Sequence, residues 1–433
     1  MRRITAGLSA AAFATLLGSG TALAADADAF AERLKEAMAS QGAQMSYDEA
    51  VSENDTVIIR GVTLGQGPNS VDFGQVNFEN VVGEPTTGYE VARVGFEDVS
   101  GIDKAEGDRD VSYDVSGMSI ENLLVAGTEP SDSQPALLQG TPFFFERGTI
   151  EEIKLSEEGK DTFTLTNLVA NSTIGDDDSF DSRLSVGNFQ LVLPENTEED
   201  GVNFAREIGY DTLTGSMNAD AAWTPQQGKV SLSPVTFNIQ NVGTLQTDLA
   251  IDGYTPQVIQ SLQQITDEMR KNPEGQQNSG MAFMGILAQL SVANISVEFQ
   301  DDSLTKRVID YYAEQTSQTP EAIIDLATQT VEANLGQIGD EAFRNQVVGA
   351  VRNFLETPES IRVATEPSQP IPFMQIFGAA MGAPQTIPNV LQLTVESDGG
   401  APASTAPAPG TDASGTAGSG STESGSGGAN SAQ

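Results

Sequence analysis

The sequence predicts an α+β fold, in which a large, mostly antiparallel, curled β-sheet is followed by a helix-rich part packed on it. Between Thr56 and Asp252, apolar residues recur at every second position in runs separated by turn-forming residues, as in half-buried strands. From Thr255 onward, apolar residues recur at helical spacing instead. The chain therefore divides into a β-rich region, residues 25–254, and a helix-rich region, residues 255–398.

The two ends of the chain are predicted to lie outside the folded part. Residues 1–24 read as a secretory signal peptide, because Arg2 and Arg3 precede an apolar stretch and Ala22-Leu23-Ala24 is a small-x-small cleavage site. Residues 399–433 consist almost entirely of small and polar residues, so we expect a disordered Gly/Ser tail. No later segment is long and apolar enough to span a membrane. We therefore expect an exported, periplasmic protein.

The β-rich region is expected to open with one short helix, capped by Asp26 or Asp28, whose apolar residues Phe30, Leu34 and Met38 recur at helical spacing. Residues 57–64 are apolar at both odd and even positions, which favours a deeply buried strand. Residues 235–240 and 245–252 alternate cleanly and should be half-buried strands.

A short motif recurs in this region: two apolar residues in alternation, then Glu or Thr, then Asn or Asp, then another apolar residue. Its copies are spaced irregularly, so they do not define a solenoid. We interpret the motif as a strand that ends in an Asx-type turn. Any antiparallel meander could also produce such runs, and both readings stay open. The copies are residues 76–81, 94–99, 118–123 and 163–168, with a partial copy at 150–153.

Start and stop signals divide the helix-rich region into elements. Helices are predicted to follow Thr255, to cover residues 280–290, and to begin after Ser303, at Thr319-Pro320 and after Asp340. Strands are predicted at residues 293–300, 361–365 and 391–396, the last two flanking a Pro-rich linker.

The chain contains no histidine and no cysteine in its 433 residues. This composition excludes His- or Cys-dependent catalysis, metal sites built from these residues, and disulfides. The formal net charge of −40 excludes nucleic acid as a partner and disfavours anionic headgroups. We predict no catalytic, cofactor-binding or metal-ligating residues, no cofactor, and a protein that is not an enzyme.

Four other features of the sequence are candidate sites. The acidic run Gly175–Asp181 could bind calcium, but its consecutive carboxylates favour a solvated loop. The same interpretation applies to Glu198-Glu199-Asp200. Gly65-Gln66-Gly67 lacks the pattern of a dinucleotide loop and indicates a turn. Trp223, the one Trp, is expected to pack at the end of a strand rather than stack on a ligand.

Two segments are rich in Met and Phe. Flexible Met-rich surfaces suit hydrophobic ligands or partner helices, but an apolar helical stripe usually faces a core, and core packing is the favoured prediction. The residues are Met281, Phe283, Met284, Ile286 and Leu287, with Phe373, Met374, Ile376, Phe377 and Met381.

The signal peptide, the meander with endings such as Ile120-Glu121-Asn122-Leu123, and the C-terminal helices resemble the AsmA-like group of Gram-negative envelope proteins. The resemblance spans residues 56–252. It implies a long curled sheet whose apolar inner face can carry lipids between membranes. This chain departs from the pattern because it is short and lacks a membrane anchor.

The expected function is that of a periplasmic, non-catalytic binding or scaffold protein of the cell envelope. It would hold an apolar ligand in a β-groove lined by Val62, Phe78, Phe96 and Ile120, or bind an envelope protein partner. The alternative is a secreted or surface-associated protein-interaction module with the tail as a spacer. A hydrolase that uses paired carboxylates ranks third.

Overall fold

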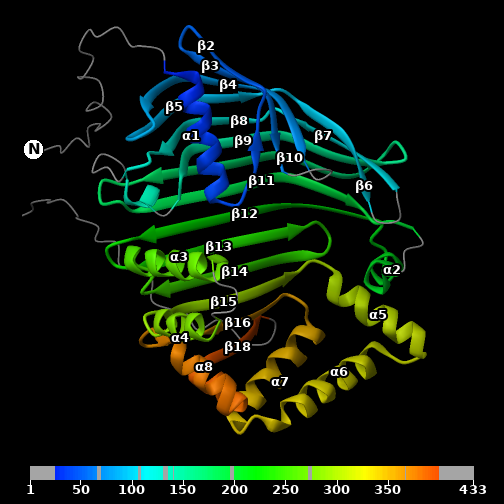
Figure 1. Cartoon of the computed structure of the whole chain (residues 1–433). Helices are drawn as coiled ribbons and strands as arrows, with labels where there is room; N and C mark the ends of the chain where they lie inside the picture. The colour runs from blue at the N-terminus through cyan, green and yellow to red at the C-terminus, as the bar shows by residue number, and fades with distance from the viewer. Residues whose placement is uncertain are drawn as a thin grey trace, which may run out of the picture. The chain divides into compact units, whose positions relative to one another are not determined.

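The computed structural model describes residues 25–65, 70–105, 109–129, 135–139, 141–195, 199–271, 276–365 and 367–398. Within these ranges, 18 strands form one antiparallel sheet, and helices lie beside it (Figure 1). The strands of the β-rich region are β1 (Met45–Ser46), β2 (Glu49–Glu53), β3 (Thr56–Leu64), β4 (Val71–Glu84), β5 (Gly88–Phe96), β6 (Val99–Ala105), β7 (Arg109–Ser116), β8 (Ser119–Ala126), β9 (Phe143–Glu157), β10 (Lys160–Ile174), β11 (Phe180–Val192), β12 (Thr212–Thr224), β13 (Lys229–Ile239) and β14 (Gly243–Asp252).

The helix-rich region adds four strands and most of the helices. Its strands are β15 (Ser291–Asp301), β16 (Ser360–Thr365), β17 (Ile371–Pro372) and β18 (Leu393–Asp398). The α-helices of the described chain are α1 (Ala27–Ser40), α2 (Asp200–Glu207), α3 (Pro256–Lys271), α4 (Gln276–Leu287), α5 (Leu304–Thr316), α6 (Pro320–Asn334), α7 (Glu341–Glu356), α8 (Phe373–Gly382) and α9 (Ile387–Leu391), with 3₁₀ turns η2 (Ala136–Gln139), η3 (Leu335–Gln337) and η4 (Pro384–Thr386).

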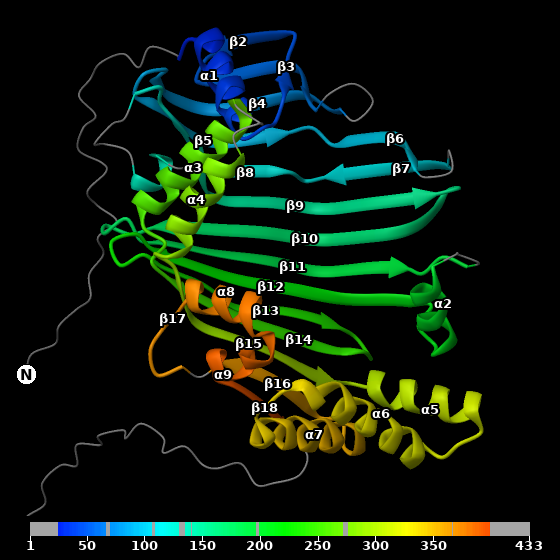
Figure 2. The same cartoon turned by 60° about the horizontal axis from the view of Figure 1, so that its bottom comes forward.

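The sheet is a meander in which neighbouring strands follow one another along the chain. From β2 the pairing runs through β3, β4 and β5, then β8 to β16, and ends at β18. β9 is long enough to pair with β8 along its first half and with β7 along its second half. Because β6 pairs with β7, the β6–β7 hairpin extends the β5–β8 pair along the same direction (Figure 2).

The helices are insertions between strands that remain neighbours. α3 and α4 separate β14 from β15, α5 to α7 separate β15 from β16, and α8 and α9 precede β18. Because β15 pairs with β14 over Gly243–Asp252, the sheet continues across the predicted boundary at residues 254 and 255. The predicted α+β class, with a large curled antiparallel sheet and helices in the C-terminal part, is confirmed.

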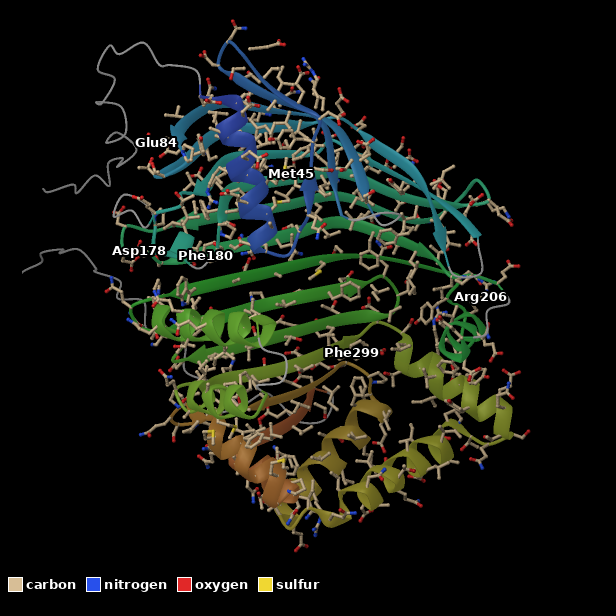
Figure 3. All side chains as sticks on the ribbon, viewed as in Figure 1. Met45, Glu84, Asp178, Phe180, Arg206 and Phe299 are labelled. Carbon is tan, nitrogen blue, oxygen red and sulfur yellow. The ribbon has the colours of Figure 1, made fainter. Side chains whose placement is uncertain are left out.

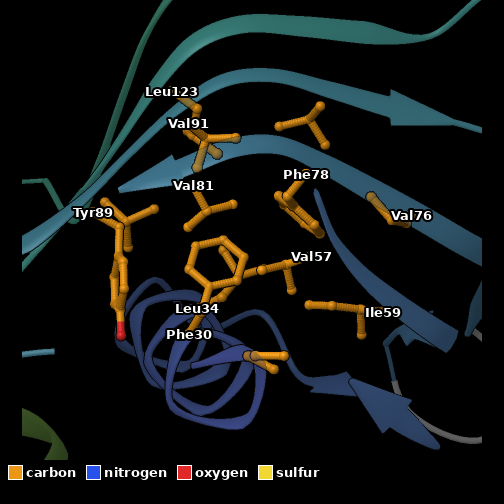
Figure 4. Packing of buried hydrophobic residues seen from close by; sticks show 14 of the residues in the cluster. Phe30, Leu34, Val57, Ile59, Val76, Phe78, Val81, Tyr89, Val91 and Leu123 are labelled. Carbon is orange, nitrogen blue, oxygen red and sulfur yellow. The ribbon is translucent and has the colours of Figure 1, made fainter. Parts of the chain in front are cut away.

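One face of the sheet is apolar, and α1 covers it at the N-terminal end. Asp26 caps α1 by accepting hydrogen bonds from the backbone N–H groups of Asp28 and Ala29, as predicted. Phe30 is fully buried and contacts Phe78 and Tyr89 edge to face, at ring-centroid distances of 5.0 and 5.1 Å (Figure 4). This contact fixes α1 against β4 and β5.

The copies of the recurring motif at residues 76–81, 118–123 and 163–168 lie inside strands, so the interpretation as a strand ending was wrong for them. It was right for the copy at residues 94–99, because β5 ends at Phe96 and β6 begins at Val99. Asn80, Asn122 and Asn167 adopt left-handed φ angles of 55°, 51° and 56° in the interiors of β4, β8 and β10. Asn is one of the few non-glycine residues that tolerate this region. At each Asn the alternation of side chains slips by one position while the pairing register with the neighbouring strand stays the same, so in β4 the buried residues are Val76, Phe78 and then Val81.

A left-handed residue inside the strand also explains why residues 57–64 are apolar at both odd and even positions. Gly61 has a φ of 65°, and the pairing register between β3 and β4 shifts beside it. Val57, Ile59 and Val62 therefore all lie buried on one face, although their numbers change parity. The strand is buried on one face and not on both.

The helix starts in the C-terminal region follow the predictions with two exceptions: α4 covers Gln276–Leu287 rather than residues 280–290, and Ser303 does not cap α5. Thr319 and Asp340 cap α6 and α7 through their side chains. Ser303 makes no such bond at α5; Asp301 accepts from the backbone N–H of Thr305 at 2.8 Å instead. The Ser303 hydroxyl donates to the carbonyl of Asn241 and accepts from Arg307, and Asp301 takes the capping role at α5.

The second acidic run was also misread as a solvated loop. Glu199 is the residue before α2, and Asp200 is the first residue of that helix. Acidic side chains in a first turn are stabilised by the helix dipole, which is why a short acidic run can begin a helix. Glu198 lies outside the described residues.

Candidate functional site

A large apolar cavity lies between α1 and the sheet, and we call it the α1 groove. Its volume is about 450 Å³. Ligand sites are typically clefts of about 300–1,000 Å³ lined mainly by apolar side chains. The lining comprises Leu34, Met38, Met45, Val62, Leu64, Phe73, Val76, Phe78, Val94, Phe96, Met118, Ser119, Ile120, Leu123, Phe143, Phe145, Gly148, Thr149, Ile150, Leu168 and Ala170.

The walls of the α1 groove come from elements far apart in the sequence. Leu34 and Met38, on the C-terminal half of α1, form one wall, and Met45 on β1 lies beside them (Figure 3). β4, β5 and β8 provide the floor. β9 and β10 provide the opposite wall, where Ile150 pairs with Leu168 across the two strands.

The left-handed Asn residues bring the floor residues to the same side of the sheet. Phe78 pairs with Val94, which pairs with Ile120, and these three residues form one row across three strands. Beyond Asn80 and Asn122 the next apolar row continues on the same face. Without the slip, the second row would point to the opposite, solvent-facing side.

The polar groups in the lining satisfy one another. Ser119 and Thr149 are the lining residues with polar side chains, and their hydroxyl oxygens lie 2.8 Å apart in a hydrogen bond. The lining contains no carboxylate, ammonium or guanidinium group. The α1 groove can therefore take up an apolar molecule without leaving a buried polar group unpaired.

Polar contacts fasten α1 at both ends of the groove. Arg33 donates to the carbonyl oxygens of Ala126 and Gly127, at 2.7 and 3.3 Å, at the end of β8. Nearer the groove, Tyr47 donates to the Glu32 carboxylate at 3.0 Å. This bond lowers the pKa of Glu32, and burial together with the same bond raises the pKa of Tyr47. The helix is thus held to the sheet on both sides of its apolar face.

The structure places all four predicted lining residues, Val62, Phe78, Phe96 and Ile120, in the α1 groove. The alternation of the strands indicated their shared face. The contributions of α1, β1, β9 and β10 were missed, although Phe143 and Phe145 in β9 alternate as groove residues should.

The apolar face continues past the groove. Cross-strand pairs join Leu168 to Val186, Val186 to Met217, and Met217 to Phe237. Phe237 pairs with Leu245, and Phe189 stacks on Phe237 with ring centroids 5.2 Å apart. The outer part of this face is only partly covered: the residues about two-fifths exposed are Leu232, Phe237, Leu245, Val297 and Val363.

A smaller hollow of about 290 Å³ lies where α3 crosses the sheet. Trp223, near the end of β12, is buried there and donates its Nε1–H to the carbonyl of Tyr254 at 2.8 Å. Its ring also contacts the ring of Tyr254. This position agrees with the expectation that Trp223 packs at the end of a strand.

A third hollow, of about 350 Å³, is polar and lies where β10 to β13 meet. Arg183 donates two hydrogen bonds to Asp220, at 2.6 and 2.8 Å. The bond to Asp220 raises the pKa of Arg183, and the bond from Arg183 lowers the pKa of Asp220. Since each charge already has its partner, and Arg183 is exposed and Asp220 half-buried, the pair is a surface ion pair that holds β11 to β12.

The acidic run Gly175–Asp181 covers the turn between β10 and β11, residues 175–179, and the first two residues of β11; Asp178 lies at the rim of the sheet (Figure 3). Asp177 accepts from the backbone N–H of Ser179 at 3.2 Å, and hydrogen bonds from Ser179 lower its pKa. Within the described ranges, no group of three or more acidic side chains is placed to hold a metal ion. The predicted turn at Gly65-Gln66-Gly67 lies partly outside those ranges.

The Met- and Phe-rich segments split between core and surface. Ile286 on α4 is buried against Val258 and Ile265 of α3, as core packing predicts. α8, in contrast, has no buried residue, and Phe377 and Met381 are exposed, so core packing is wrong for this helix. α8 contacts α4, β17, η4 and α9, and these contacts leave Phe377 and Met381 exposed.

Two comparisons with known proteins bear on the chain. A family model described only as "Uncharacterized protein" matches residues 236–398, which begin within β13 and include α3 to α9. No curated protein matches the chain. Among the described residues, no helix combines the length and the apolar character that crossing a membrane requires.

Proposed function

We propose that this protein is an exported, non-catalytic binding protein of the cell envelope that holds an apolar ligand in the α1 groove. The observation that carries the proposal is the groove itself: a cavity of about 450 Å³ whose lining is apolar apart from two hydroxyls bonded to each other. A dry apolar cavity of about 150 Å³ is already large enough to bind benzene. The α1 groove has room for a longer hydrocarbon chain.

Composition and charge support the remaining parts of the proposal. The pattern of residues 1–24 supports export, although these residues lie outside the described ranges. The absence of His and Cys from the sequence and of charged side chains from the groove lining supports a binding role without chemistry. The resemblance to AsmA-like proteins stays a prediction, and the proposal does not depend on it.

The test compares the same substitution inside and outside the groove. Ala170 lines the α1 groove, and Ala219 lies in the same cross-strand row, joined to Ala170 through Leu184. We expect Ala170→Phe to fill the groove and to weaken binding of the uncharged fluorescent probe N-phenyl-1-naphthylamine at least tenfold. Ala219→Phe should bind the probe like the unmodified protein.

Extraction of the protein purified from its native host should yield an apolar compound by mass spectrometry, and the Ala170→Phe variant should lack it. Circular dichroism checks that both variants fold. If Ala170→Phe does not fold, Ile120→Gln tests the same groove by adding a polar group without extra bulk. Probe binding that is equal in the groove variants and the unmodified protein would show that the α1 groove is not the site.

A further inference from the structure

α4 and α8 form a surface unlike the rest of this acidic chain. No charged residue occurs between residues 275 and 297, which contain α4, or between residues 367 and 395, which contain α8 and α9. In the whole chain 19% of residues are charged. α4 and α8 contact each other and lie side by side in Figure 1, so the two uncharged segments meet in space.

Large apolar side chains point outward from these two helices. Phe283 on α4 is 47% exposed, and Phe377 and Met381 on α8 are 43% and 75% exposed. α8 consists of apolar residues, glycines and one Gln, yet none of its residues is buried. An apolar helix without a covering layer indicates an interaction surface.

We propose that this α4–α8 surface docks on a zwitterionic lipid bilayer, with Phe283, Phe377 and Met381 inserted among the headgroups. Elsewhere the strongly negative chain is repelled by anionic surfaces. The α4–α8 surface carries no charge that insertion would have to remove from water. Interfacial helices bind in this way, through an apolar face that enters the boundary between headgroups and acyl chains.

The area of exposed apolar side chains favours a bilayer over a second copy of this chain. Three large side chains, between 43% and 75% exposed, present on the order of 300 Å². A stable dimer buries about 800 Å² on each partner. Insertion into a bilayer needs no matching surface, so a few protruding side chains can suffice.

Flotation with phosphatidylcholine vesicles tests the proposal on the full chain. We expect the protein to float with the vesicles, and the Phe377→Glu/Met381→Glu variant to bind at least tenfold more weakly. The matched control is Ile102→Glu/Leu326→Glu, which adds the same two charges at apolar residues of β6 and α6 that are 72% and 57% exposed. This control should bind like the unmodified protein. Replacing part of the phosphatidylcholine with phosphatidylglycerol should weaken binding.

The absence of native cysteine permits a direct measurement of insertion. A polarity-sensitive fluorophore on Met381→Cys should shift to the blue with phosphatidylcholine vesicles, whereas the same label on Leu326→Cys should not. Equal flotation of the two double variants would overturn the proposal, as would failure of the unmodified protein to float. Concentration-dependent self-association that Phe377→Glu/Met381→Glu abolishes, without flotation, would assign the surface to a second copy instead.

The outcome does not depend on the α1 groove. The α8 variant should still bind N-phenyl-1-naphthylamine, and Ala170→Phe should still float with vesicles. Failure of the docking surface and failure of the proposed ligand site can therefore be told apart.

Discussion

Single asparagines control which face of the sheet the side chains that follow them occupy. Asn80, Asn122 and Asn167 each adopt a left-handed backbone conformation inside a strand, where most side chains would be strained. The slip that follows each of them keeps apolar residues on one face of the sheet. The Asn of the motif is therefore needed because the backbone at its position must adopt a left-handed conformation.

Substitution of Asn80 tests this requirement at an exposed position with a φ of 55°. We expect Asn80→Val to lower the free energy of unfolding by about 1–3 kcal/mol, because a β-branched residue is strained in this conformation. Asn80→Gly, the control, should stay within about 1 kcal/mol of the unmodified protein. Urea unfolding followed by circular dichroism measures both. Equal losses in the two variants would mean that the side chain of Asn80, and not its backbone, matters.

At the scale of elements, side chains on the polar face tie strands together. Asp248 on β14 accepts hydrogen bonds from the hydroxyls of Ser233 on β13 and Ser296 on β15, the latter at 2.7 Å. Burial alone would raise the pKa of Asp248, but these bonds outweigh it, and the pKa lies below its ordinary value. The ionised carboxylate therefore holds three neighbouring strands together.

The stability contributed by Asp248 should depend on pH. Its pKa is depressed in the folded state, so the contribution is fully present above the unfolded pKa of about 3.9 and is lost as the pH falls through the folded value. At pH 7, Asp248→Asn should cost about 1 kcal/mol, a modest value because the site is partly solvated. Urea unfolding should show this cost shrinking between pH 5 and pH 2.5.

Ser296→Ala provides the control for this pH dependence. With one of its donors removed, Asp248 should lose part of its pKa depression, so the stability of this variant should vary less steeply with pH than that of the unmodified protein. A cost of Asp248→Asn that stays constant across the same pH range would contradict the assignment.

At the scale of the whole molecule, charge opposes compactness. The sequence holds 61 acidic and 21 basic residues, so most carboxylates have no basic partner to neutralise them. Self-repulsion of this kind destabilises a folded chain and is weakened by salt, since the Debye length falls from about 30 Å at 0.01 M to about 10 Å at 0.1 M.

We therefore expect the urea midpoint of unfolding to rise as NaCl increases from 10 to 300 mM, with most of the change below 100 mM. Sodium sulfate at equal ionic strength separates screening from salt exclusion, because screening depends on ionic strength whereas exclusion favours sulfate. A midpoint that is flat or falls with NaCl would show that the acidic groups lie too far apart to repel one another.

Much of the architecture could be predicted from local pattern. Alternation indicated the half-buried strands, and Asp26, Thr319 and Asp340 marked helix starts correctly. The start of α2 was missed because an acidic run is equally common in loops. Val62, Phe78, Phe96 and Ile120, on β3, β4, β5 and β8, were predicted as lining residues, because the alternation of apolar and polar residues in these strands indicates which side chains face the core.

By itself, the sequence determined which residues are apolar on each strand, where helices begin, and which chemistry is closed to a chain without His and Cys. These are local properties, set by side-chain type and spacing. Only the tertiary structure decided that α1 and β10 face each other across a cavity, and that α8 stays uncovered. Both depend on which segments meet in space, and the same apolar helix can be core or surface according to whether another layer covers it.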